Sequence, residues 1–135
     1  MNTTQQSFEE EISLLFEVIG KAVRTQIILA IGKDEACVCH LEAVLGLRQA
    51  YLSQHLMTLR AAGILTTRRE GRYIFYRIRD VRLLELIQMA GVITGVPKTD
   101  LEALFQTAAL SQCKCPSCAG TIQPGHIAAE EIQTK

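Results

Sequence analysis

Five cysteines, in two short clusters, are the residues of this chain best suited to chemistry. Cys37 and Cys39 are separated by one residue, and the run CxCxxC holds Cys113, Cys115 and Cys118. An odd number of closely spaced cysteines does not fit a disulfide framework. Thiolates bind soft metal ions and can also be oxidised. The two clusters therefore predict thiols that bind a metal or respond to an oxidant.

The number of thiolates decides which ion fits. Two thiolates make an open, weak site, three suit As(III), Sb(III) or Pb(II), and four suit Cd(II) or Zn(II). On a regular helix, positions i and i+2 point about 200° apart, so Cys37 and Cys39 share an ion only at a frayed first turn or on a deformed helix. We expect Cys113, Cys115 and Cys118 to complete the site, within one chain or from a second copy. A tail that chelates metal independently is the alternative.

The cysteine pair begins the first of two predicted helices. Apolar residues at helical spacing indicate helices over residues 37–45 and 49–62, with Gly46 in the turn between them. This arrangement is typical of a helix-turn-helix. Residues 64–68 and 73–78 are rich in β-formers and flank a glycine turn, which predicts a β-hairpin. The predicted fold is mainly α with a small β-hairpin, a winged helix-turn-helix.

Three further helices are predicted over residues 8–19, 22–31 and 81–93. Ser7 and Asp80 are expected to cap the first and last of them, and the KDEA segment is expected to be a polar link. The wide apolar surface of the first and last helices predicts a homodimer interface.

Three regions follow from these elements. Residues 1–7 are expected to form a flexible N-terminus, and residues 8–96 the DNA-binding and dimerisation domain. Residues 97–135 are expected to form a C-terminal extension, with a short helix over residues 100–110 and the cysteine-rich tail.

Composition narrows the partners. Hydrophobic residues make up 48% of the chain, and no apolar run approaches the ~20 residues of a membrane span. The polar, acidic N-terminus does not resemble a secretory signal, so a cytoplasmic protein without a membrane partner is expected. The formal net charge is zero, but residues 48–82 hold eight arginines and only two acidic residues. A concentrated arginine block favours binding to a polyanion.

The leading end of the second helix of the motif carries side chains suited to base edges in the major groove. These are Gln49, Ala50, Tyr51, Ser53 and Gln54. The residues expected to contact phosphates, or a minor groove in the case of the hairpin, are Arg48, His55, Arg68, Arg69 and Arg72. The expected partner is double-stranded DNA with two-fold symmetry, matching a homodimer.

The pattern YLSQHLMTLRAAGIL and the hairpin RREGRYIFYRI resemble the ArsR/SmtB family of metal-responsive winged-helix repressors over residues 8–93. The matching positions of the recognition helix are Ser53, His55, Leu56, Leu59, Ala62 and Gly63. The CVC pair before His40 and Leu41 resembles the motif of the arsenic- and cadmium/lead-sensing branches. The resemblance implies a homodimer that represses an operator and leaves it when As(III), Sb(III), Cd(II) or Pb(II) binds.

Some positions depart from the family pattern. Glu42 stands where arsenic sensors often have a third cysteine, and His40, where an Asp is common, is interpreted as a surface residue rather than a ligand. At the zinc site of the zinc-sensing branch Asp80 is retained, but Arg82 replaces a histidine. Ile93 and Val96 occupy the later ligand positions. That zinc site is predicted to be absent, with Asp80 acting as a helix cap.

Two other functions are compatible with the cysteines. A repressor of the same fold could respond to thiol oxidation or persulfide formation. A thiol metallochaperone or scavenger belongs to another class. An enzyme is not expected, because the sequence has no acid/base constellation, no glycine-rich phosphate loop and no CxxC at a helix start.

Overall fold

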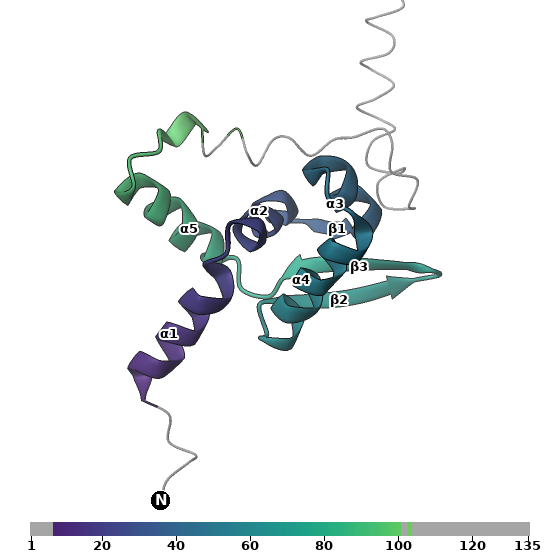
Figure 1. Ribbon diagram of the computed structural model, residues 1–135, viewed down its shortest axis with the longest axis horizontal. Helices are drawn as coiled ribbons and strands as arrows, with labels where there is room; N and C mark the ends of the chain where they lie inside the picture. The colour runs from purple at the N-terminus through teal and green to yellow at the C-terminus, as the bar shows by residue number, and fades with distance from the viewer. Residues whose placement is uncertain (1–6, 101–102, 104–135) are drawn as a thin grey trace, which may run out of the picture.

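The computed structural model describes residues 7–100 and 103, which form five helices and one small sheet (Figure 1). In chain order these are α1 (Phe8–Ile19), α2 (Ala22–Ile31), β1 (Glu35–Cys37), α3 (Val38–Leu45), α4 (Gln49–Ala61), β2 (Leu65–Glu70), β3 (Tyr73–Ile78) and α5 (Arg82–Ile93). The predicted winged helix-turn-helix is confirmed. Residues 98–100 and 103 are helical, and the other residues of the predicted last helix lie outside the described residues, as do Cys113, Cys115 and Cys118.

The predicted cap at Ser7 is confirmed, whereas Val81 rather than Asp80 is the N-cap residue of α5, although Asp80 still binds the start of that helix. The backbone N–H of Glu10 donates to the Ser7 hydroxyl oxygen at 3.2 Å. The backbone N–H of Arg82 donates to Oδ1 of Asp80 at 3.0 Å. Each contact satisfies one of the donors that a helix N-terminus leaves without an intrahelical partner.

The KDEA segment is not simply a polar link, as the sequence had suggested. Its last two residues and Cys37 form β1, which makes the hairpin a three-stranded antiparallel sheet in the order β1-β3-β2. Glu35 pairs with Arg77 and Cys37 pairs with Phe75. A hairpin edge offers unpaired backbone groups, and β1 satisfies them on one side of β3. Three residues are too few to show a strand periodicity, so the pattern alone could not reveal β1.

The core fixes the orientation of α4. Leu52, Leu56 and Leu59 are fully buried, as their helical spacing predicts, and they pack with buried residues of α2 and α3. Burial of each such side chain contributes roughly 1.5–3 kcal/mol. Because this stripe faces inward, the opposite side of α4 faces solvent.

The helices α1 and α5 lie on the side of the domain away from the tip of the hairpin (Figure 1). Both expose large apolar side chains, namely Phe8, Ile12, Leu14, Phe16, Met89, Val92 and Ile93. No helix among residues 7–100 is long and apolar enough to cross a membrane.

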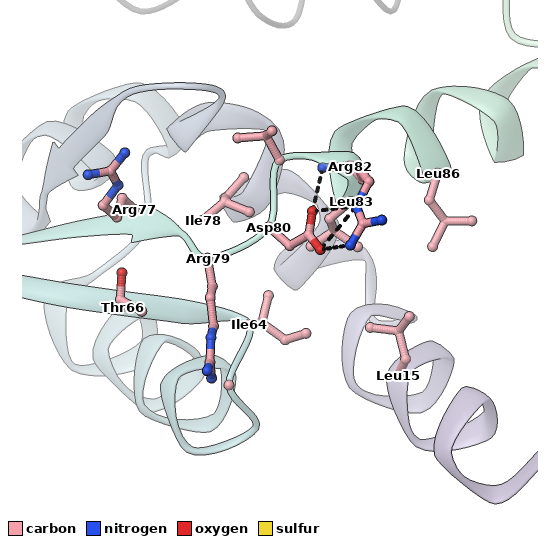
Figure 2. Close-up of a pocket in the computed structure, with 12 residues that line it drawn as sticks. Leu15, Ile64, Thr66, Arg77, Ile78, Arg79, Asp80, Arg82, Leu83 and Leu86 are labelled. Atoms are coloured by element: carbon pink, nitrogen blue, oxygen red, sulfur yellow. Dashed lines mark hydrogen bonds and ion pairs between the residues drawn. The ribbon is translucent and has the colours of Figure 1, made fainter. Parts of the chain in front are cut away.

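A groove of about 1070 Å³ opens between α1, the base of the hairpin and the start of α5 (Figure 2). Leu15, Ile64 and Leu86 contribute apolar side chains to it. On its wall, two nitrogens of the Arg82 guanidinium donate to the carboxylate of Asp80 at 2.6 to 3.2 Å. These hydrogen bonds lower the pKa of Asp80 to about 2. The Asp80 carboxylate is therefore already engaged by Arg82 and by the α5 N-terminus.

Candidate DNA-binding surface and thiol site

The turn of the helix-turn-helix ends α3 at Gly46, which has a φ of 68°. Its backbone N–H donates to the carbonyl oxygen of Glu42 at 2.8 Å. Glycine tolerates this left-handed conformation, and the geometry is a common helix stop. Residues 46–48 then redirect the chain into α4, with Arg48 at its N-cap.

The leading end of α4 faces solvent. Arg48, Gln49, Ala50, Tyr51 and Gln54 are exposed, and Ser53 is half-buried. The structure thus places all six predicted side chains at the surface of one helix end, without interrupting the core. This is the arrangement that a helix needs to enter a major groove.

Met57 was missed by the sequence reasoning. Its side chain is 68% exposed, and it lies three residues after Gln54 and seven after Ala50, on the same face of α4. Its place in the sequence could have indicated its exposure, because Met57 does not belong to the buried stripe that contains Leu52 and Leu56. An exposed apolar side chain on this face is suited to contact a thymine methyl group.

His55 does not lie where a phosphate contact needs it. It is only 8% exposed, and its Nδ1 accepts a hydrogen bond from Nε of Arg24 at 3.2 Å. Nη1 of Arg24 also donates to the Val18 carbonyl oxygen, and the Tyr51 ring meets the His55 ring edge-on at 4.7 Å. Burial lowers the pKa of His55, and the charges of Arg24 and Lys21 lower it further. A neutral imidazole is needed to accept from Arg24, so His55 joins α4 to α2 instead.

Arg68 is also not available as predicted. Its Nε and Nη2 donate to the two carboxylate oxygens of Glu35 at 3.0 and 2.9 Å, and its Nη1 donates to Glu70 at 2.9 Å. The guanidinium carbon lies 4.5 Å from the centre of the Phe75 ring. Arg68 therefore spans the sheet, and a phosphate would have to displace these contacts. Sequence could not show this, because Glu35 lies 33 residues away.

Arg69 and Arg72 remain exposed on the hairpin. Gly71, with a φ of 63°, allows the tight turn between β2 and β3. The two arginines therefore lie at the projecting end of the hairpin, where phosphate or minor-groove contacts are expected.

Cys37 and Cys39 are brought together. Their sulfur atoms are 3.0 Å apart. Cys37 is not in the helix but is its N-cap, with an extended backbone at φ −85° and ψ 166°. The poor alignment expected for i and i+2 on a regular helix is thus avoided, because Cys37 precedes the first turn. The pair therefore lies at the N-terminal end of α3, as one of the two expectations had it, but Cys37 caps the first turn rather than belonging to a frayed one.

The two cysteines pack among aromatic side chains of the sheet. Cys37 is 1% exposed and packs with Phe75, while Cys39 is partly exposed and packs beside them with Tyr73. The backbone N–H of His40 donates to Sγ of Cys37 at 3.4 Å.

His40 is not the surface residue that the sequence had suggested. It is 8% exposed, and burial lowers its pKa. Its position beside Cys39, two residues into α3, turns the side chain toward the interior. The imidazole is therefore kept neutral, which is the form that can bind a metal.

A helix-turn-helix with an arginine-bearing hairpin defines the winged-helix class of DNA-binding regulators. The family model described as "Bacterial regulatory protein, arsR family" matches residues 22–67. The chain is 36% identical over 91 residues to the biofilm growth-associated repressor of Agrobacterium fabrum, covering 67% of this chain and 78% of that protein. This chain belongs to the ArsR/SmtB family of transcriptional repressors.

Two further similarities bear on the site. The chain is 39% identical over 66 residues to the arsenic resistance transcriptional regulator ArsR1 of Pseudomonas putida, covering 48% of this chain and 52% of that regulator. The crystal structure of the repressor BigR from Xylella fastidiosa matches with a TM-score of 0.59 and 32% identity, over 63% of this chain and 87% of that one. The members of this family are regulators rather than enzymes.

Proposed function

We propose that this chain is a homodimeric repressor that leaves its operator when a soft metal or metalloid ion binds its cysteines. The candidate ions are As(III), Sb(III), Cd(II) and Pb(II), with Zn(II) as a further candidate. The observation that carries the proposal is the 3.0 Å separation of two sulfurs at the N-cap of α3. Cys113, Cys115 and Cys118 are proposed to supply the remaining ligands.

The geometry of the pair supports an ion site that opens on binding. In a tetrahedral site with M–S bonds of ~2.3 Å, two sulfurs lie roughly 3.8 Å apart. The sulfurs of Cys37 and Cys39 would therefore separate by about 0.8 Å on binding such an ion. That change occurs where β1 ends and α3 begins, and α3 packs against α4. Ligand binding thus acts close to the recognition helix.

The second candidate is a repressor that responds to an oxidant or a persulfide. The same 3.0 Å contact favours it, since the S–S bond of a disulfide is ~2.05 Å long. Oxidation would bring the two sulfurs closer, whereas an ion would separate them. The scavenger alternative depends on the tail cysteines, which lie outside the described residues.

DNA binding is assigned to the exposed face of α4 and to the hairpin. Gln49, Ala50, Tyr51, Ser53 and Gln54 are proposed to contact bases, and Arg48, Arg69 and Arg72 to contact phosphates. The exposed apolar residues of α1 and α5 support a homodimer, which would present two α4 helices to a two-fold symmetric operator.

The test is a release titration on the full chain bound to an operator selected from random duplexes. As(III), Sb(III), Cd(II), Pb(II), Zn(II) and an oxidant are added separately to wild type, to Cys37→Ser and to a chain truncated before Cys113. We expect Cys37→Ser to bind DNA normally and to lose release by the ion. Normal release of Cys37→Ser by every ion would refute the ion-sensor assignment. Release of wild type by the oxidant alone would favour the second candidate.

A further inference from the structure

Three side chains from three strands form one row across the sheet. Phe75 of β3 pairs with Cys37 of β1 on one side and with Arg68 of β2 on the other. Phe75 and Cys37 are each 1% exposed and form a small core of their own, separate from the main core. The buried thiol is therefore in contact with the strand that forms half of the hairpin.

Arg68 closes this row from the solvent side. Its guanidinium lies over the Phe75 ring and forms a two-pronged ion pair with Glu35, two residues before Cys37. An exposed ion pair alone contributes little to stability. Here, however, the paired geometry, the ring contact and the bond to Glu70 hold one guanidinium in one place. Arg68 on β2 thus binds the Glu35 side chain on β1, across the intervening strand β3.

We propose that Arg68 is a positioning residue that couples the thiol pair to the hairpin, so that an ion at Cys37 and Cys39 changes the hairpin as well as α3. The proposal rests on the ion-responsive function proposed above. Cys37 is at once the last residue of β1 and the cap of α3. Displacing its sulfur therefore displaces β1, and the Glu35–Arg68 ion pair transmits that displacement to β2.

The coupling assigns different roles to two neighbouring arginines. Arg68 and Arg69 carry the same charge on the same strand, but in register Arg68 faces Phe75 and Arg69 faces Ile74. Arg69 is exposed and is proposed to contact DNA. Replacing Arg68 should therefore alter the response to the ion, while replacing Arg69 should alter DNA affinity.

The experiment compares the full chain with Arg68→Gln, Arg69→Gln and Glu35→Gln. Operator affinity is measured by fluorescence anisotropy without ion, with As(III) and with Cd(II), and bound ions are counted by native mass spectrometry. When the ion binds, the operator affinity of wild type is expected to fall by a factor of roughly 5 to 150, the usual range of allosteric couplings. Arg68→Gln and Glu35→Gln should bind the same number of ions as wild type. In both variants, the logarithm of the factor by which the ion weakens operator binding should be at most a quarter of the wild-type value. Arg69→Gln should bind DNA more weakly and keep the full factor.

The outcomes separate the coupling from the function that it serves. If Arg68→Gln and Glu35→Gln bind the ion and keep the wild-type factor, the coupling is overturned and the sensor function stands. If wild type binds the ion without losing operator affinity, both fail together. Should Arg68→Gln be unstable, Glu35→Gln removes the same ion pair from the other side and decides the question. Equal loss of the factor in Arg69→Gln would also contradict the coupling, because it would mean a general effect of hairpin charge.

Discussion

At the scale of single residues, two side chains that were predicted to contact DNA, His55 and Arg68, instead bind charged partners within the chain. Arg24 and Arg68 both bind acceptors far along the chain, His55 in one case and Glu35 in the other. Arg24 joins α2 to the recognition helix, and Arg68 joins the hairpin to β1. The residues proposed to contact DNA are those whose side chains are exposed and outside these contacts, such as Gln54 and Arg72.

The His55–Arg24 contact predicts a dependence of stability on pH. The folded chain holds the pKa of His55 below its ordinary value of 6.5. The unfolded chain then binds more protons, so the contribution of neutral His55 is present above pH 6.5 and is lost as the pH falls toward the lower folded pKa. His55→Gln keeps an acceptor for Arg24 but does not titrate. We expect the Tm of wild type to fall relative to that of His55→Gln as the pH is lowered from 8 to 5.

Differential scanning calorimetry across this range provides the measurement. His40 also has a pKa lowered by burial, but it is present in both proteins, so its effect cancels in the difference. A difference in Tm that stays constant with pH would show that His55 does not titrate with unfolding.

At the scale of elements, the helical periodicity of apolar residues was enough to predict most of the fold. The predicted bounds of α1 and α2 match the structure at both ends, because apolar residues at helical spacing and the glycines that follow define them. The strand β1 was beyond prediction, since three residues acquire strand geometry only from their pairing with β3. The thiol pair was partly predictable. Its residues were, but the extended conformation of Cys37 that brings the sulfurs together depends on β1.

The two DNA-facing elements should respond differently to substitution. Met57→Ala on α4 should weaken operator binding several-fold more than binding to random duplex, because it removes an apolar contact to base edges. Arg72→Ala at the hairpin tip should weaken both kinds of binding alike and reduce the slope of log affinity against log salt by about 1. Salt titrations of anisotropy on both duplexes make the comparison. Loss confined to the operator in Arg72→Ala would argue against a phosphate role.

At the scale of the whole molecule, α1 and α5, which expose large apolar side chains, lie on the side of the domain away from the tip of the hairpin (Figure 1). A dimer formed through α1 and α5 would leave both copies of α4 and the hairpin accessible. For two recognition helices to bind one face of DNA, their half-sites must be about one helical turn, ~34 Å, apart.

This separation of surfaces predicts a charge substitution that abolishes dimers without unfolding the chain. Ile93 on α5 is 77% exposed and lies outside the core. Ile93→Glu should shift the chain to monomers in sedimentation velocity, since an unpaired charge in an apolar interface is costly. Met57→Glu is the matched control, because Met57 is also apolar and 68% exposed but lies on α4. It should remain dimeric while losing operator binding. A dimer that survives Ile93→Glu would place the interface elsewhere.

The unequal burial of the two thiols also sets an order of events in time. Cys39 is partly exposed, whereas Cys37 is 1% exposed and packs against Phe75. If the chain senses an ion as proposed, the ion would meet Cys39 first and would exchange onto Cys37 only when the junction of β1 and α3 opens. The first encounter would then be reversible and leave the DNA contacts intact, and the second step would cause release. Brief exposure to an ion would then not release the operator, and only an ion that stays bound until that junction opens would do so.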